Sequence, residues 1–332
     1  MISLEKRKKV YELVNELGVE QTAIDENLPE KTVKDYARRW VQYCNAKKLS
    51  NGKAKILCFD IETNFMKNAT WGLWKQNIHI GQILEDWSLI CWSAKWLLED
   101  EIFNGCVTPE ESILRDDKQA TIKLWKLIDE ADIIVAHNLL GFDLKKMNTC
   151  FHKHGLGKPS PCQYIDTLKI SRGQLNYPSN KLDYIAKANG IPMKHDTGFA
   201  LWRECDGVDA IIKEEITSTK NSILKITTYN KKIIQTALDY MSSYCDNDVS
   251  ILEAVYLVLR EWDTRHPNLA LYGDSKENQC HVCGSINISP TNKKYITAVS
   301  RFDVFKCNDC GAYSRSRFAD TREKKLLRGV AR

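Results

Sequence analysis

The chain has 332 residues, of which 43% are hydrophobic and 27% are charged, and its formal net charge at pH 7 is +5. This composition is ordinary for a globular protein, and the length allows one large domain or a medium-sized domain with appendages. No run of about 18 apolar residues predicts a membrane span, and the residues after Met1 lack the apolar segment of a secretion signal. We therefore expect no membrane partner and a cytoplasmic protein, in a bacterial cell or a phage-infected host.

Residues 1–50 are predicted to form a small helical unit. Apolar residues recur at helical spacing over 4–17, Gly18 ends that helix, 19–24 can form a short second helix, and Pro29 begins a third. This order resembles a helix-turn-helix module. The third helix offers basic side chains for DNA phosphates or bases: Lys31, Lys34, Arg38 and Arg39. A protein-docking bundle of three helices is the alternative, because acidic residues nearly balance this charge.

A polar stretch at 47–53 is predicted to be a linker, and a buried strand follows it at 55–58. This strand continues into Phe59-Asp60-Ile61-Glu62-Thr63. Side chains alternate across a strand, so Asp60 and Glu62 project from the same face, about 6–7 Å apart. Two such carboxylates repel each other, and hard divalent cations such as Mg²⁺ or Mn²⁺ would relieve the repulsion. A solvated strand end is the alternative for an isolated Asp-x-Glu.

The middle of the chain predicts an α/β fold, a mixed sheet with flanking helices, because strand-like and helix-like patterns follow one another. The expected strands lie at 88–96, 101–107 and 131–137, and the expected helices at 111–130, 143–154, 181–188 and 237–262. The polar segment 205–235 is predicted to be a surface loop inserted before the last helix, with a mobile hairpin as the alternative.

Further carboxylates follow at positions that could join Asp60 and Glu62. Asp143 lies in the first turn of its predicted helix, a few residues after the strand that ends near Asn138. Tyr244 and Asp248 are four residues apart in a helix and therefore share one face.

Three motifs, in this order, resemble the DEDD superfamily of 3′–5′ exonucleases, in the branch that has a tyrosine in its third motif. They are Phe-Asp-Ile-Glu-Thr at 59–63, Asn-x-x-x-Phe-Asp at 138–143, and Tyr-x-x-x-Asp at 244–248. The resemblance covers about 54–265 and implies a ribonuclease H-like fold. It also implies release of 5′-mononucleotides from a 3′ end of DNA, with single strands preferred, in replication, proofreading or repair. A DNA polymerase or another replication protein is the partner that it implies.

The same resemblance implies the roles of the site residues. Two Mg²⁺ or Mn²⁺ ions would be held by four carboxylates, those of Asp60, Glu62, Asp143 and Asp248. The resemblance further implies that Tyr244 orients the attacking water. The residues expected to contact the terminal nucleotide are Thr63, Asn138 and Phe142. We expect Asp166, which follows a short strand, to support the site without binding a metal.

Two other functions remain open at this stage. An exonuclease that trims RNA 3′ ends would use the same residues, because the catalytic motifs do not report on the 2′-hydroxyl. A non-catalytic DNA-binding or docking protein of a replication complex is the alternative from another class.

The segment 270–332 is predicted to be a zinc ribbon with a basic tail. Two Cys-x-x-Cys pairs, at Cys280 and Cys283 and at Cys307 and Cys310, are separated by 23 residues. Four thiolates at this spacing are typical of a closed tetrahedral Zn²⁺ site, which is structural. Redox-active cysteines are the alternative. The many Lys and Arg residues around the pairs suggest contact with a nucleic-acid backbone, or docking to a protein.

Overall fold

The computed structural model describes residues 4–34, 36, 37, 40, 54–192, 197–219, 222–273, 275 and 277–320. Three predicted features lie outside the described residues: the linker at 47–53, the basic residues Arg38 and Arg39, and the basic tail from 321 onward. Internal contacts divide the chain into two units, one made of Lys55–Leu168 and Met193–Glu253, the other of Met1–Ala54, Lys169–Pro192 and Ala254–Arg332. The predicted boundaries at 1–50, 54–265 and 270–332 stay a prediction.

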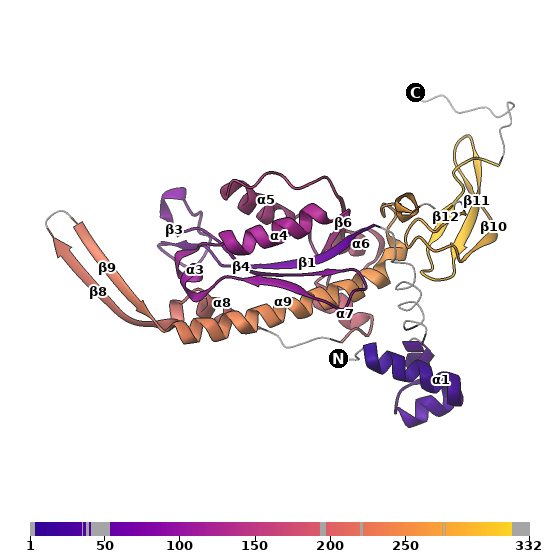
Figure 1. Ribbon diagram of the computed structural model, residues 1–332, viewed down its shortest axis with the longest axis horizontal. Coiled ribbons are helices and arrows are strands. Elements are labelled where there is room, and N and C mark those ends of the chain that lie inside the picture. The colour runs from indigo at the N-terminus through magenta and orange to yellow at the C-terminus, as the bar shows by residue number, and fades with distance from the viewer. Residues whose placement is uncertain are drawn as a thin grey trace. The chain divides into compact units, whose positions relative to one another are not determined.

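A mixed sheet lies at the centre of the first unit (Figure 1). Among the described residues it has five strands in the order β5-β4-β1-β6-β7. Strand β1 runs antiparallel to β4 and parallel to β6, while β4–β5 is antiparallel and β6–β7 is parallel. The predicted α/β class with a mixed sheet is therefore confirmed. The strands are β1 (Ile56–Thr63), β4 (Leu89–Trp96), β5 (Phe103–Cys106), β6 (Ile133–Ala136) and β7 (Gln163–Asp166).

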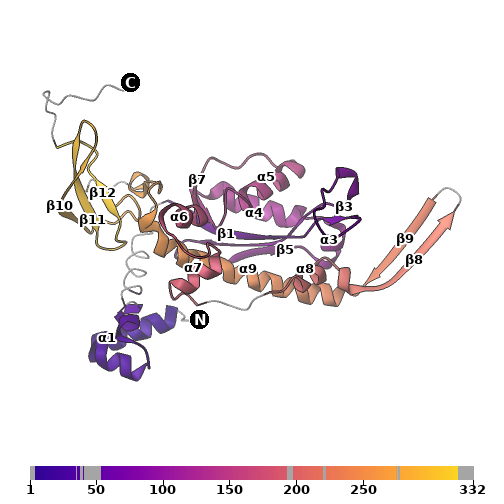
Figure 2. The ribbon, with the colours of Figure 1, turned by 180° about the vertical axis from the view of Figure 1, so that it is seen from behind.

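Helices cover both faces of this sheet (Figures 1 and 2). Helices α4 (Lys118–Glu130) and α5 (Asp143–Lys153) lie on one face, and α8 (Ala200–Cys205) with the first part of α9 (Lys231–Leu259) lies on the other. The helix predicted at 111–130 is in fact two, because Arg115 adopts a left-handed conformation (φ 53°) after α3 (Pro109–Leu114).

The core of this unit is formed by apolar side chains from the sheet and from the helices on either face. Phe59 of β1, Leu124 of α4, Met147 of α5 and Met241 of α9 are all fully buried in it. Trp92 of β4 donates its indole N–H to the Ala120 carbonyl at 2.8 Å. Its ring leaves no room at the neighbouring position of β5, where a Cβ on Gly105 would lie 2.6 Å from the indole nitrogen.

The segment 205–235 contains an antiparallel hairpin that extends away from the sheet, so the preferred prediction of a surface loop is wrong and the alternative of a hairpin is correct (Figures 1 and 2). It consists of β8 (Ile211–Thr219) and β9 (Ser222–Tyr229), which pair from Ile211 with Tyr229 to Thr219 with Ser222. The Ile and Thr residues of this segment favour extended strands, which explains why a polar segment became a ladder. A smaller two-stranded sheet joins β2 (Lys67–Asn68) to β3 (Ile83–Glu85).

The second unit contains the N-terminal helices and the cysteine-rich segment. Helix α1 (Leu4–Asp25) is kinked at Gly18, whose φ of 83° belongs to the left-handed region, as expected for the residue predicted to end the first helix. A three-stranded sheet orders β10 (Ile288–Ile296), β11 (Arg301–Cys307) and β12 (Tyr313–Arg315). Two further helices of this unit are α6 (Thr167–Gln174), which begins in the first unit, and α7 (Leu182–Ala188).

Candidate active site

Three of the predicted carboxylates meet between β1 and α9. Asp60, Glu62 and Asp248 each offer an oxygen atom, and these atoms lie within 4.8 Å of one another. The strand explains the placement: Phe59 and Ile61 enter the core, so Asp60 and Glu62 project from the opposite face of β1. The helix brings Asp248 onto the same face of the sheet.

Asp143 begins α5 and is the most buried of the predicted carboxylates, with 2% of its surface exposed. It accepts a hydrogen bond from the backbone N–H of Ile61 in β1. Its other oxygen, Oδ2, is buried and has no hydrogen-bond partner among the described residues. A buried carboxylate oxygen without a donor is costly, and a cation is one partner that would satisfy it.

Tyr244 lies one helical turn before Asp248, as the spacing predicts, and its phenol forms a hydrogen bond with the Asp248 carboxylate. A second hydrogen bond joins the phenol to the hydroxyl of Thr197. Burial raises the pKa of Tyr244, and repulsion from Asp248 and Glu62 raises it further. The phenol therefore stays protonated at neutral pH and acts as a hydrogen-bond donor rather than as a base.

The carboxylates destabilise one another's charged forms. Burial, together with repulsion from Asp248 and Asp143, raises the pKa of Glu62 to about 8. Burial also raises the pKa of Asp143, to about 7. For Asp60 the pKa is raised by burial first, then by Cys245, Asp143, Glu62 and Asp248. The cluster thus holds more negative charge than its surroundings compensate, which is the electrostatic condition that divalent cations relieve.

The loop before Asp143 is held in place by Asp166 at the end of β7. One carboxylate oxygen of Asp166 accepts the N–H of Asn138 at 3.1 Å, and the other accepts the N–H of Leu140 at 3.2 Å. Asn138 has a φ of 71°, in the left-handed region. Its carbonyl accepts the N–H groups of Gly141 and Phe142 at 3.0 and 2.9 Å. Asp166 therefore supports the backbone of this loop, and its predicted exclusion from metal binding stays a prediction.

The three residues expected to contact a nucleotide lie at the ends of elements that carry the carboxylates. Thr63 is the last residue of β1, after a shift in its register with β4. Asn138 and Phe142 belong to the loop that leads into α5, and Phe142 keeps 37% of its surface exposed. Their contact with a substrate stays a prediction.

Two residues near the carboxylates were not predicted from the sequence. The thiol of Cys245 lies 3.5 Å from the Asp60 carbonyl oxygen and 3.7 Å from its carboxylate. Thr197 reaches Tyr244 from a segment far away in the sequence. Cys245 follows Tyr244 directly, so helical periodicity could have placed it one position around α9, beside β1. No sequence signal indicates Thr197.

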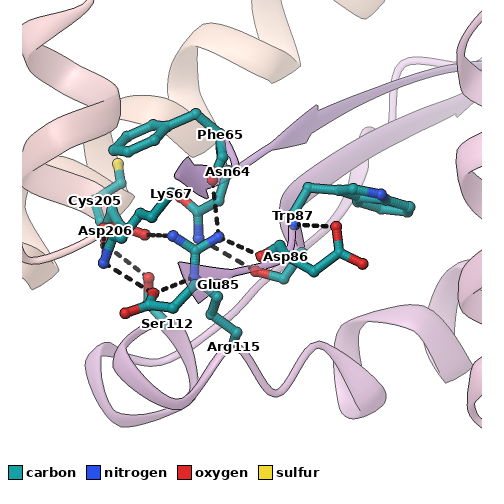
Figure 3. A network of polar contacts seen from close by, with 11 residues as sticks. Asn64, Phe65, Lys67, Glu85, Asp86, Trp87, Ser112, Arg115, Cys205 and Asp206 are labelled. Atoms are coloured by element: carbon teal, nitrogen blue, oxygen red, sulfur yellow. Dashed lines mark hydrogen bonds and ion pairs between the residues drawn. The ribbon is translucent and has the colours of Figure 1, made fainter. Parts of the chain in front are cut away.

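An arginine fixes the segment that follows β1 (Figure 3). Arg115 donates from Nε to Glu85 at 2.7 Å, and from Nη1 to the carbonyls of Phe65 and Asp86 at 2.9 and 2.6 Å. Its Nη2 pairs with the buried carboxylate of Asp206, which Lys67 also contacts at 2.6 Å. The loop after Glu62 and the segment before the β8–β9 hairpin are therefore tied to one guanidinium.

The four predicted cysteines also come together, in the second unit. The sulfur atoms of Cys280, Cys283, Cys307 and Cys310 lie within 4.8 Å of one another. Two of the Sγ–Sγ distances, Cys280 to Cys310 and Cys283 to Cys307, are 3.6 Å. A tetrahedral Zn²⁺ with Zn–S bonds of about 2.3 Å requires sulfur atoms about 3.8 Å apart, so these four thiols fit the metal. A structural metal such as zinc could therefore be bound here.

Searches of protein-family models and of curated proteins found no match to this chain. Within the part of the chain that the structure describes, no helix has the length and apolar character needed to cross a membrane.

Proposed function

We propose that this protein is a metal-dependent 3′–5′ exonuclease of the DEDD type, with a tyrosine in its third motif and a ribonuclease H-like fold. The observation that carries the proposal is the meeting of Asp60, Glu62 and Asp248 within 4.8 Å, with Asp143 near enough to raise the pKa of Asp60 and Glu62. These residues come from three motifs that are far apart in the sequence. In the proposed function they act on DNA 3′ ends, preferably single-stranded, in replication, proofreading or repair.

The donor set fits two Mg²⁺ or Mn²⁺ ions, because these ions prefer carboxylate oxygens. Asp60, Glu62, Asp143 and Asp248 would hold them. When bound, such a pair of ions stabilises negative charge on both the attacking and the leaving oxygen of a phosphodiester displacement. The same reasoning assigns a single structural Zn²⁺ to the four cysteines.

The chain's own residues position the reacting groups. The Tyr244 phenol interacts with Asp248 and Thr197 at the edge of the carboxylate cluster. We propose that Tyr244 orients the attacking water. The left-handed turn at Asn138, held by Asp166, presents Asn138 and Phe142 beside the N-terminus of α5, where a terminal nucleotide would lie. Arg115 keeps the loop after Glu62 in place while a DNA strand binds at the carboxylate cluster.

The proposed compartment is the cytoplasm, since four thiols that bind a metal must stay reduced. A DNA polymerase or another replication protein is the proposed partner.

A degradation assay tests the function. Single-stranded DNA and an RNA of matched sequence, both labelled at the 5′ end, are incubated with Mg²⁺ or Mn²⁺ and the native chain or the Asp60→Asn variant. We expect a ladder that shortens from the 3′ end of the DNA, requires the metal and disappears in the variant. Asp246→Asn is the matched control, because Asp246 lies on α9 but pairs with Ser93 and Asn104 instead of the cluster. A ladder on RNA alone would redirect the proposal to RNA trimming. Absence of cleavage by a folded native chain would contradict it.

A further inference from the structure

We propose that one face of the β10–β11–β12 sheet is a binding platform for single-stranded DNA, on which bases stack against tyrosine rings while phosphates meet basic side chains. The sheet itself carries this inference. Only the choice of DNA over RNA rests on the proposed function.

The strand register places aromatic and basic residues on the same face. Tyr295 pairs with Phe302, Val304 pairs with Arg315, and Lys306 pairs with Tyr313. Because alternate residues of β11 share a face, these three pairs point to one side of the sheet. The face consists of Tyr295, Phe302, Val304, Lys306, Tyr313 and Arg315.

Side-chain contacts agree with this assignment. The guanidinium of Arg315 lies 4.1 Å from the centre of the Phe302 ring and 5.6 Å from that of Tyr295. The centres of these two rings are 6.4 Å apart. At the other end of the face, the Lys306 ammonium lies 5.7 Å from the centre of the Tyr313 ring. Rings and cations therefore alternate over the surface instead of forming separate patches.

Much of this face is open. Tyr313 is 61% exposed and Tyr295 is 51% exposed, and Lys306 and Arg315 are exposed as well. Neither cation forms an ion pair with a carboxylate within the portion of the chain that the structure covers. Their positive charge is therefore available to a ligand.

The opposite face of the same sheet provides an internal contrast. Lys294 pairs with Asp303 and, at 2.9 Å, with Asp320, while Arg301 pairs with Asp320 at 3.1 Å. The cations of that face are thus neutralised by neighbouring carboxylates. Only the face that carries the tyrosines combines open rings with unneutralised cations.

This combination fits a single-stranded polynucleotide. Aromatic rings stack on bases of any sequence, and basic side chains between the rings attract the phosphates that link those bases. A duplex hides the faces of its bases, so it could use the cations but not the rings. An acidic peptide would likewise satisfy the cations and leave the rings without a stacking partner. The exposed rings therefore favour single strands over both.

Fluorescence anisotropy with a labelled oligothymidylate tests the platform. The full chain carries Asp60→Asn so that the strand is not degraded, and no chelator is used, so that the cysteine cluster keeps its metal. We expect Tyr313→Ala to weaken binding about tenfold, because base stacking on a ring of this kind contributes about 1–3 kcal/mol. Tyr313→Phe keeps the ring and should bind like the parent.

The dependence of affinity on salt concentration distinguishes the contribution of charge from that of stacking. Lys306→Ala should lower the slope of log affinity against log salt by about 0.7, the value for one phosphate contact on a single strand. Tyr313→Ala should leave that slope unchanged. On the opposite face, Ile296→Ala and Arg301→Ala are matched controls and should change neither affinity nor slope. Zinc content and circular dichroism of each variant show that the ribbon remains folded.

Several results would overturn the proposal. These are unchanged affinity in Tyr313→Ala and Lys306→Ala, equal affinity for the duplex, or affinity changes in the opposite-face controls as large as those in the platform variants. Tighter binding of oligouridylate would overturn the choice of DNA. Because binding is measured without cleavage, failure of the exonuclease assay leaves this test intact, and the reverse also holds.

Discussion

The cysteine cluster and the carboxylate cluster both gather like-charged ligands, but they are built in opposite ways. The buried core around the cysteines consists of Cys280, Val282, Cys283, Cys307, Cys310 and Ala312, so the ligands are themselves most of that core. The carboxylates instead lie at the edge of a large apolar core formed by the sheet, α4, α5 and α9. Binding of a metal should therefore hold the ribbon together, whereas the fold around Asp60 should hold its ligands in place without a metal.

The largest effect should follow loss of a cysteine ligand. Cys307→Ser should release the zinc and open the ribbon, because structural zinc contributes about 10–16 kcal/mol in small zinc-binding peptides. Zinc content measured by mass spectrometry, together with limited proteolysis between 280 and 310, reports both changes. Cys162→Ser, outside the cluster, should retain the metal. A Cys307→Ser variant that keeps its zinc and resists protease would contradict the conclusion that metal binding holds this segment together.

The next effect concerns a buried carboxylate that does have cationic partners. The Asp206 side chain is fully buried, as is most of Arg115. Arg115→Ala should lower the free energy of unfolding by about 3–5 kcal/mol, because it removes one of the two cationic partners of a buried charge. Arg203→Ala, which breaks an exposed pair with Asp209, should cost far less, because water screens exposed ion pairs. Urea denaturation measures both, and equal losses would show that burial does not decide the cost.

The third effect is a dependence of stability on pH that arises from the carboxylate cluster. Without added divalent metal, folding raises the pKa of Glu62 to about 8. The native state then binds more protons than the unfolded state between the ordinary glutamate pKa and pH 8, so stability falls as pH rises through that range. We expect a decrease of a few kcal/mol between pH 5 and about 8. It should be smaller in Glu62→Gln and in the presence of Mg²⁺. A flat profile in the native chain would contradict the electrostatic part of the comparison.

The smallest effect tests the loop beside the carboxylates. A Cβ on Gly141 would lie 2.3 Å from Oδ1 of Asn138, an atom at the end of a side chain that can rotate away. Gly141→Ala should therefore change stability by less than about 1 kcal/mol. If Asn138 contacts the substrate, the displacement should raise KM for DNA. Gly157→Ala, where the Cβ meets nothing within 4 Å, is the control. An unchanged KM in Gly141→Ala would argue against a substrate contact by Asn138.

Local patterns were sufficient to predict the elements that carry the site. Alternation along 55–63 predicted that Asp60 and Glu62 share a face, and the four-residue spacing predicted the same of Tyr244 and Asp248; in each pair the structure brings the two together. The paired Cys-x-x-Cys motifs predicted the cysteine cluster. These signals are short in sequence and follow directly from strand and helix periodicity.

Contacts between residues that are distant in the sequence could not be predicted from sequence patterns. Arg115 lies in a segment predicted to be a continuous helix, and its partners at Glu85 and Asp206 are distant along the chain. Thr197 meets Tyr244 only because the fold brings them together. The hairpin at 211–229 was mistaken for a loop because its polar composition outweighed its β-branched residues. The contacts of Arg115 and Thr197 depend on tertiary packing, whereas the hairpin follows a local β propensity that was given too little weight.

The position of β1 inside its sheet has a consequence for hydrogen exchange. The strand pairs with β4 along most of its length, but with β6 only over Ile56–Cys58, so the amides of this first part are released only when one of these ladders opens. Protection of amides in such a central strand usually approaches that of global unfolding. Ile56–Cys58 is therefore the part of β1 expected to open last, and Asp60 and Glu62 follow it on the part of the strand that pairs with β4 alone.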